Sequence, residues 1–227
     1  MKDLIAVNKP KGPSSNQFLS QLRRLLNTKK IGHAGTLDPL ASGVLVVGIG
    51  REATKQLPLA VGGEKEYLAE IVLGKNSTTD DEEGEKTVIT ETNNLNIDKE
   101  KIAEVLLDFQ GVIWQQPPIF SALKIKGTPA YKLARRGEIE SLPKRQVEIK
   151  TIEIIDFTWP KLEIKVVCLK GVYIRSLARD IGEKLNCGAY LGNLIRTRVG
   201  QFKLEDSLSL EQVQAKYLQD KKKKSNN

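Results

Sequence analysis

Hydrophobic residues recur every three or four positions in several stretches of the chain, a spacing typical of helices that bury one face. In the first stretch, Ser14 or Ser15 can cap a helix whose apolar face follows at once. That face carries Phe18, Leu19, Leu22, Leu25 and Leu26. Four further helices are predicted: after an Asp98 cap, after the cap-then-proline pair Thr128-Pro129, and over residues 173–185 and 210–218.

Other stretches have the composition or the period-two alternation of strands. They cover residues 4–7, 65–73, 121–125, 146–157, 162–168 and 196–202. Residues 44–49 are apolar throughout, and this short run predicts a buried strand. Several of these strands follow one another without a helix between them. We therefore expect an α/β fold with a mixed, mainly antiparallel central sheet flanked by helices and loops.

A chain of 227 residues with 40% hydrophobic content can bury one substantial core. We assign residues 1–218 to one main domain and residues 219–227, which include four consecutive lysines, to a disordered tail. Residues 76–86 are polar, acidic and rich in turn formers, so we expect a surface loop there.

Charge changes this picture by suggesting a partner. The chain has 36 Lys and Arg against 28 Asp and Glu, a net charge of +8. Basic residues cluster within 23–30, 132–136 and 196–198, whereas acidic residues concentrate within 80–85. A polyanion fits this separation, and we favour nucleic acid over a membrane surface because no basic amphipathic helix with Trp or Phe anchors is visible.

Two function classes are excluded by what the chain lacks. No apolar run reaches the roughly 18 residues of a membrane helix, and residues 1–10 do not have the layout of a signal peptide, so we expect an intracellular protein. Cys168, Cys187 and the single histidine, His33, offer little for a zinc or haem site. We expect no catalytic metal.

The most informative segment runs from residue 32 to residue 43. Its glycines allow backbone conformations closed to other residues, and Pro39 stiffens the peptide after Asp38. The carboxylate would then be presented on a fixed loop. An aspartate that only caps a turn has the same local pattern, so spacing by itself leaves both interpretations open.

Residues 32–45 closely resemble the catalytic motif of the TruB-type pseudouridine synthases, and further similarities extend from about residue 4 to residue 214. They are found at Lys9-Pro10 with Gly12, Ser14 and Ser15; at Lys65-Glu66-Tyr67; at 73–84, 121–124 and 131–137; and at 170–177 and 188–197. The resemblance implies the pseudouridine synthase fold. It also implies isomerisation of uridine 55 in the tRNA T loop to pseudouridine, without a cofactor.

By this resemblance Asp38 is the nucleophile or essential carboxylate. Tyr67 packs on the target base and is a candidate base, and Arg175 pairs with Asp38. A guanidinium beside a carboxylate keeps the carboxylate ionised in a dry pocket, so the pairing is physically reasonable. Alternative interpretations remain for two of these residues: a core aromatic for Tyr67 and a phosphate-binding arginine for Arg175.

The resemblance also suggests which residues bind RNA. His33 would fill the space left by the flipped nucleotide, and Leu191 would pack in the active site, although a plain core leucine is the alternative. Lys9 is a candidate for supporting the loop beside Pro10. The RNA-binding assignment covers His33, Lys9, Leu191, Lys124, Arg135 and Arg196.

Members of this family usually continue into a C-terminal RNA-binding domain, often of PUA type, and residues after 218 show no full domain of that kind. We expect a cytoplasmic monomer with no obligate protein partner that binds the T stem-loop of tRNA. Two alternatives stay open: a guide-RNA-dependent pseudouridylase of the same family, and a tRNA-folding chaperone.

Overall fold

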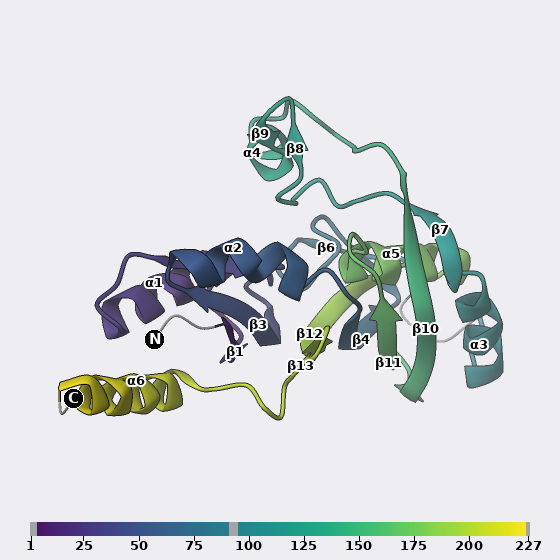
Figure 1. Ribbon diagram of the computed structural model, residues 1–227. Coiled ribbons are helices and arrows are strands. Elements are labelled where there is room, and N and C mark those ends of the chain that lie inside the picture. The colour runs from purple at the N-terminus through teal and green to yellow at the C-terminus, as the bar shows by residue number, and fades with distance from the viewer. Residues whose placement is uncertain (1–3, 91–94, 226–227) are drawn as a thin grey trace. The chain divides into compact units, whose positions relative to one another are not determined.

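The structure of the protein is a computed structural model that describes residues 4–90 and 95–225 (Figure 1). The chain divides into two compact units. Unit 1 comprises Met1–Tyr67 and Ile195–Asn227, and unit 2 comprises Leu68–Leu194. The chain passes between the units within two strands, β4 (Lys65–Leu73) and β12 (Ala189–Val199).

Unit 1 is built on strand β3 (Ala41–Ile49). Strands β1 and β2 both pair with β3 in antiparallel register, and β13 pairs in the same sense with the end of β12. The remaining elements of this unit are β1 (Leu4–Lys9), α1 (Ser15–Leu25), β2 (Ile31–Ala34), α2 (Arg51–Ala60), β13 (Phe202–Lys203) and α6 (Leu210–Ser225).

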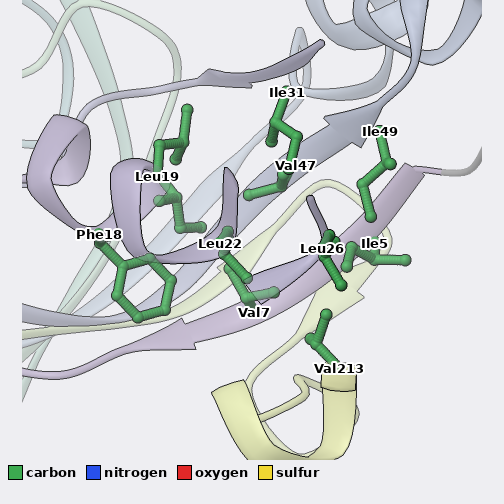
Figure 2. Close-up of a cluster of buried hydrophobic side chains, with 11 residues drawn as sticks. Ile5, Val7, Phe18, Leu19, Leu22, Leu26, Ile31, Val47, Ile49 and Val213 are labelled. Atoms are coloured by element: carbon green, nitrogen blue, oxygen red, sulfur yellow. The ribbon is translucent and has the colours of Figure 1, made fainter. Parts of the chain in front are cut away.

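Strand β3 is buried on both faces, which explains its unbroken apolar sequence. Its odd-numbered residues and those of β1 face helix α1 and Val213 of α6, forming the cluster in Figure 2. The members are Ile5, Val7, Phe18, Leu19, Leu22, Leu26, Ile31, Leu45, Val47, Ile49 and Val213. The buried strand predicted over residues 44–49 is confirmed.

The even-numbered residues of β3 form a second cluster with Ala6, Val199 and Leu57 of α2. Helix α2 lies close to the strand at Gly48, where an added Cβ would meet the backbone of Ala53 at 2.9 Å. Unit 1 therefore has helices on both faces of its sheet. The sequence analysis does not predict α2, although a strand buried on both sides needs a second cover.

Helix α1 begins where its sequence predicts. The Ser14 hydroxyl accepts a hydrogen bond from the Gln17 amide, and the Gln17 side chain accepts one from the Ser14 amide. This reciprocal capping box satisfies two amides that the first helical turn leaves without partners. The helix then buries Phe18, Leu19 and Leu22.

Unit 2 contains a sheet with the strand order β12-β4-β11-β10-β7. Strand β10 pairs in antiparallel register with both β11 and β7, and helix α3 contacts β10 and α5. The elements are β5 (Lys75–Ser77), β6 (Lys86–Val88), α3 (Lys99–Leu107), β7 (Gly111–Gln115), β8 (Lys124–Ile125), β9 (Thr128–Pro129), α4 (Ala130–Arg135), β10 (Arg145–Thr158), β11 (Lys161–Cys168) and α5 (Ile174–Lys184).

The core of unit 2 shows why β10 does not keep a strict alternation. Ile149 and Ile152 are both buried although one number is odd and the other even. The pairing with β11 shifts between Ile149 and Thr151, so an irregularity there moves the buried positions from odd to even. Opposite them, β11 buries every even-numbered residue from Leu162 to Cys168.

The predicted α/β class with a mainly antiparallel sheet is confirmed, while several boundaries were wrong. Strands β2 and β7 were not predicted, and only Lys124–Ile125 is a strand within 121–125. Helix α4 starts at Ala130 with Pro129 as its cap, so Thr128 does not cap it. The last long strand starts at Ala189 rather than at residue 196.

Helix α6 continues to Ser225, so its backbone is helical in most of the stretch for which a disordered tail is expected. Asn226 and Asn227 lie outside the described residues. Among the residues that the structure describes, no helix combines the length and the apolar character needed to cross a membrane.

Replacing Phe18 with alanine should lower the free energy of unfolding by about 3–5 kcal/mol, because the ring is fully buried between α1 and the sheet and its loss leaves a cavity. Leu59→Ala in α2 is the matched control: that side chain is 90% exposed and its loss should change stability by less than about 0.5 kcal/mol. Urea unfolding followed by circular dichroism measures both. Equal effects would contradict the described core.

Candidate active site

Asp38 lies in unit 1, on the loop that joins the antiparallel pair β2 and β3. Its side chain is half-buried. Strand β2 pairs with the second half of β3, from Ala34 opposite Val46 to Ile31 opposite Ile49. The segment over residues 32–43, which was expected to be a fixed loop, therefore contains the end of β2, a six-residue turn over residues 35–40 and the start of β3.

Backbone hydrogen bonds hold the peptides on both sides of Asp38. The Ser15 hydroxyl donates to the Leu37 carbonyl at 2.8 Å and accepts from the Leu37 amide at 2.9 Å. The Ala41 amide donates to the Asp38 carbonyl at 3.1 Å, and the Gly12 amide donates to the Pro39 carbonyl at 2.8 Å. The carboxylate is thus presented from a fixed backbone.

Arg196 supports the same loop from β12. Its guanidinium is 1% exposed and donates to the carbonyls of Gly35 at 2.7 Å and Val44 at 2.8 Å. An added Cβ on Gly43, whose φ is +103°, would meet the Arg196 carbonyl at 2.3 Å, so only glycine fits there. These donors serve the loop, and the assignment of Arg196 to RNA binding stays a prediction.

Lys9 has a similar internal role. The side chain is 0% exposed, and its ammonium donates to the carbonyls of Pro10 and Pro13, each at 2.8 Å. Burial lowers the pKa of Lys9 from 10.5 to about 8; the Asp38 charge opposes this shift and the Arg196 charge adds to it. Lys9 therefore stabilises the turn over residues 10–13, whose Gly12 amide binds the Pro39 carbonyl. Its hydrogen bonds serve the turn beside Pro10, and its assignment to RNA binding stays a prediction.

His33 lies on β2 with its ring partly buried. Burial lowers the pKa of His33, and the positive charges of Arg196 and Arg23 lower it further, so the imidazole is neutral at pH 7. Its Nδ1 is buried without a hydrogen-bond partner among the described residues. A neutral ring with an unused nitrogen is suited to a base or a ribose rather than to a phosphate.

Tyr67 ends the first of the two segments of unit 1 and is 7% exposed on β4. It shares the unit with Asp38, and the strand alternates as predicted. Both of its proposed roles, packing on a base and proton transfer, stay predictions.

Arg175 lies in unit 2, at the start of α5, and is buried. Its guanidinium forms an ion pair with the buried Asp81 at 3.4 Å and donates to the carbonyls of Thr79 at 3.3 Å and Phe120 at 3.0 Å. Asp38 and Arg175 belong to different units, and their pairing stays a prediction. Asp81, however, is a partner that the sequence analysis missed.

The acidic stretch 76–86 is accordingly more than a surface loop. Asp81 is buried, and the neighbouring Asp80 pairs with Arg179 at 2.9 Å, one turn after Arg175 on α5. Burial raises the pKa of Asp80, an effect that the Arg179 and Arg175 charges oppose. The sequence contains a signal for these ion pairs: two adjacent aspartates, and two arginines four residues apart on one predicted helix.

Leu191 lies on β12 in the core of unit 2, fully buried, and its amide donates to the Asp80 carbonyl at 3.0 Å. The burial of its side chain agrees with the alternative interpretation as a core leucine, and its contact with RNA stays a prediction.

Lys124 and Arg135 are exposed, on β8 and α4. A hollow of about 480 Å³ near them is lined by Thr128, Lys132, Arg135 and Arg136. Residues 121–137 contain five cations and no acidic residue: the cations are Lys124, Lys126, Lys132, Arg135 and Arg136. Arg136 forms an ion pair with Glu138 at 2.9 Å. The excess of cations over this single carboxylate gives the surface the positive charge that attracts an RNA backbone.

Within the described part of the chain, no three His, Cys, Asp or Glu residues gather in a group that could hold a metal ion. Cys168 and Cys187 are both buried free thiols.

Two family models match the chain. "TruB family pseudouridylate synthase (N terminal domain)" matches residues 23–174, and "tRNA pseudouridylate synthase B C-terminal domain" matches residues 175–226. A tRNA pseudouridine synthase B of Francisella tularensis (strain WY96-3418) is 44% identical over 94% of this chain and 70% of its own length. The corresponding protein of Clostridium kluyveri is 45% identical over 93% and 72%.

Solved structures are also similar. A chain of a Cbf5-Nop10-Gar1 complex has a TM-score of 0.71 and 31% identity, over 94% of this chain and 54% of that one. A chain of an H/ACA RNP bound to a substrate RNA containing 2'-deoxyuridine has a TM-score of 0.70 and 28% identity, over 97% and 55%. The chain thus spans about half the length of these structural relatives.

Lys9 should give the protein a distinctive pH dependence. The unfolded chain binds the Lys9 proton up to pH 10.5 and the folded chain only up to about 8, so the free energy of unfolding should rise between these values. The neutral amine keeps two N–H donors for Pro10 and Pro13. Lys9→Met, which cannot titrate, should lack this rise. Urea unfolding of both proteins from pH 7 to pH 10.5 measures the difference, and parallel curves would contradict the buried cation.

Proposed function

The chain belongs to the TruB family of pseudouridylate synthases, and from this we propose that it isomerises uridine 55 in the T loop of tRNA to pseudouridine. The reaction breaks the N1–C1′ bond of the nucleotide and forms a C5–C1′ bond, while C5 loses a proton and N1 gains one. It is redox neutral, and in this proposal it needs neither cofactor nor metal.

One observation carries the proposal: Asp38 lies within the matched region, on a loop whose backbone is held at Gly35, Leu37, Pro39 and Val44. A carboxylate nucleophile must approach one atom of a base in one orientation. A rigid loop lowers the entropic cost of reaching that orientation. A turn-capping aspartate would need no such support.

The proposed reaction begins with flipping of the target nucleotide out of the T loop. His33 fills the space that the nucleotide leaves, and its neutral ring suits that role because stacking and contact with the loop need no charge. Tyr67 packs against the flipped uracil. Arg175, whose guanidinium forms an ion pair with Asp81 within unit 2, is the proposed partner of Asp38 in the reacting complex.

We assign RNA binding to the exposed cations of residues 121–137, with Lys124 and Arg135 as the named contacts. In an A-form stem, phosphates and 2′-hydroxyls are the accessible groups, and Lys and Arg donors match them. The proposal makes the enzyme a cytoplasmic monomer. Two buried free thiols suit a reducing compartment.

A guide-RNA-dependent reaction is the second candidate, favoured by the structural likeness to a chain of a Cbf5-Nop10-Gar1 complex and to a chain of an H/ACA RNP. Those chains are 28–31% identical to this one, whereas the two tRNA pseudouridine synthases are 44–45% identical. Free tRNA as substrate therefore has the stronger support. Incubating purified protein with unmodified tRNA transcript alone, and mapping pseudouridine at single-nucleotide resolution, tests the choice.

Asp38→Asn should abolish turnover, because the amide is a poor nucleophile at the same position. Affinity for tRNA should change by less than about tenfold, or 1.4 kcal/mol, since it comes mainly from phosphate and shape contacts. Asp206→Asn makes the same chemical change at an exposed site and should leave turnover unchanged. Near-normal pseudouridine formation by Asp38→Asn would remove Asp38 from the mechanism. A variant that is inactive and still refolds tRNA would show that chaperone activity coexists with catalysis.

Tyr67→Phe keeps the aromatic ring and removes the hydroxyl. If the phenol transfers a proton, the rate should fall by about a hundredfold while tRNA affinity stays constant. Single-turnover kinetics and filter binding give the two numbers, and Tyr217→Phe on α6 is the control. An unchanged rate would leave Tyr67 as a packing residue only.

A further inference from the structure

Ser15 occupies a position where an apolar residue would be expected. It shares a face of α1 with Phe18, Leu19 and Leu22, at spacings of three, four and seven residues, and all four are buried. Its side chain nevertheless is polar, and the residue is 1% exposed. A buried hydroxyl on an apolar stripe calls for a partner, since burying it without one is costly.

That partner is the peptide that carries the nucleophile. The Ser15 hydroxyl donates to the Leu37 carbonyl at 2.8 Å and accepts from the Leu37 amide at 2.9 Å, so one side chain satisfies both backbone groups of one residue. The Leu37 carbonyl belongs to the peptide bond that joins Leu37 to Asp38. Fixing this group fixes the plane from which the Asp38 side chain projects.

The neighbouring contacts leave this peptide little freedom elsewhere. The Leu37 side chain is buried, and the Asp38 and Pro39 carbonyls are held by Ala41 and Gly12. Without the Ser15 hydroxyl, two buried backbone groups at Leu37 would lose their partner, and rotation of the peptide toward water would turn the Asp38 carboxylate away from its direction.

We propose that Ser15 is a positioning residue of the reaction, which sets the direction of the Asp38 carboxylate through the Leu37 peptide and touches neither RNA nor the reacting atoms. The proposal rests on the proposed function for its kinetic consequence. The clamp itself is a property of the loop that can be measured without turnover.

The adjacent serine provides a matched control. Ser14 caps helix α1 through the Gln17 amide and has no bond to the Asp38 loop. Ser14→Ala and Ser15→Ala therefore remove the same hydroxyl at successive positions of one helix start. The first destabilises the helix end, and the second releases the loop.

The experiment compares wild type, Ser14→Ala, Ser15→Ala and Ser15→Thr at a temperature where each is fully folded by circular dichroism. Ser15→Ala should lower kcat by about tenfold to a hundredfold, the effect of a displacement near 1 Å at a reacting group, with KM and tRNA affinity unchanged. Ser14→Ala should lower Tm and leave kcat at the wild-type value. Ser15→Thr keeps the hydroxyl and should retain more activity than Ser15→Ala.

Hydrogen exchange at the Leu37 amide gives the readout that needs no activity, and Ser15→Ala should accelerate it while Ser14→Ala should not. If wild-type protein forms no pseudouridine, the proposed function fails, and this exchange still tests the clamp. The positioning role is overturned if Ser15→Ala keeps the wild-type kcat, if Ser14→Ala loses as much kcat, or if tRNA affinity falls in step with kcat. It is overturned as well if Ser15→Ala folds at no temperature, since Ser15 would then be a folding determinant.

Discussion

The burial of strand β3 on both faces is the constraint on which unit 1 depends. Odd-numbered residues pack on the α1 side and even-numbered residues on the α2 side, and a shift by one position would put a Cβ where Gly48 lies, 2.9 Å from the backbone of Ala53. The Asp38 loop enters β3 directly at Ala41. The register of the core strand therefore decides where the loop begins, and the position of Asp38 depends on this packing.

Polar contacts then hold the backbone of the loop. Ser15, Lys9 and Arg196 direct their described donors to backbone carbonyls. Hydrogen bonds to carbonyls offset the desolvation of the buried cations and hold these peptides in place. In unit 2, Arg175 differs from these cations because its charge is compensated by the buried carboxylate of Asp81. Its guanidinium also donates hydrogen bonds to two backbone carbonyls.

Sequence patterns predicted the elements with strong periodicity: α1 with its Ser14 cap, β4 and the long strands β10 and β11 agree with their apolar spacing. They missed α2, whose interior contains Pro58, and β2, whose glycine suggested a loop. The motif around Asp38 could be located from the sequence, but the side chains that hold its backbone could not. Ser15 and Arg196 lie 22 and 161 residues from the loop groups they bind, at Leu37 and Gly35, and no local rule connects them.

Net charge does not distinguish buried cations from those that are exposed to a polyanion. Lys9, Arg175 and Arg196 are buried, and their donors serve carbonyls or a buried carboxylate. Counting them toward a polyanion surface overstates the attraction, because a buried charge already satisfied by the protein releases no counterions from RNA. The cations of residues 121–137 are the opposite case: Lys124 and Arg135 are exposed, and no acidic side chain lies among them in the sequence. Since lysine and arginine serve both purposes, burial separates the cations that bind backbone carbonyls from the exposed cations to which we assign RNA binding.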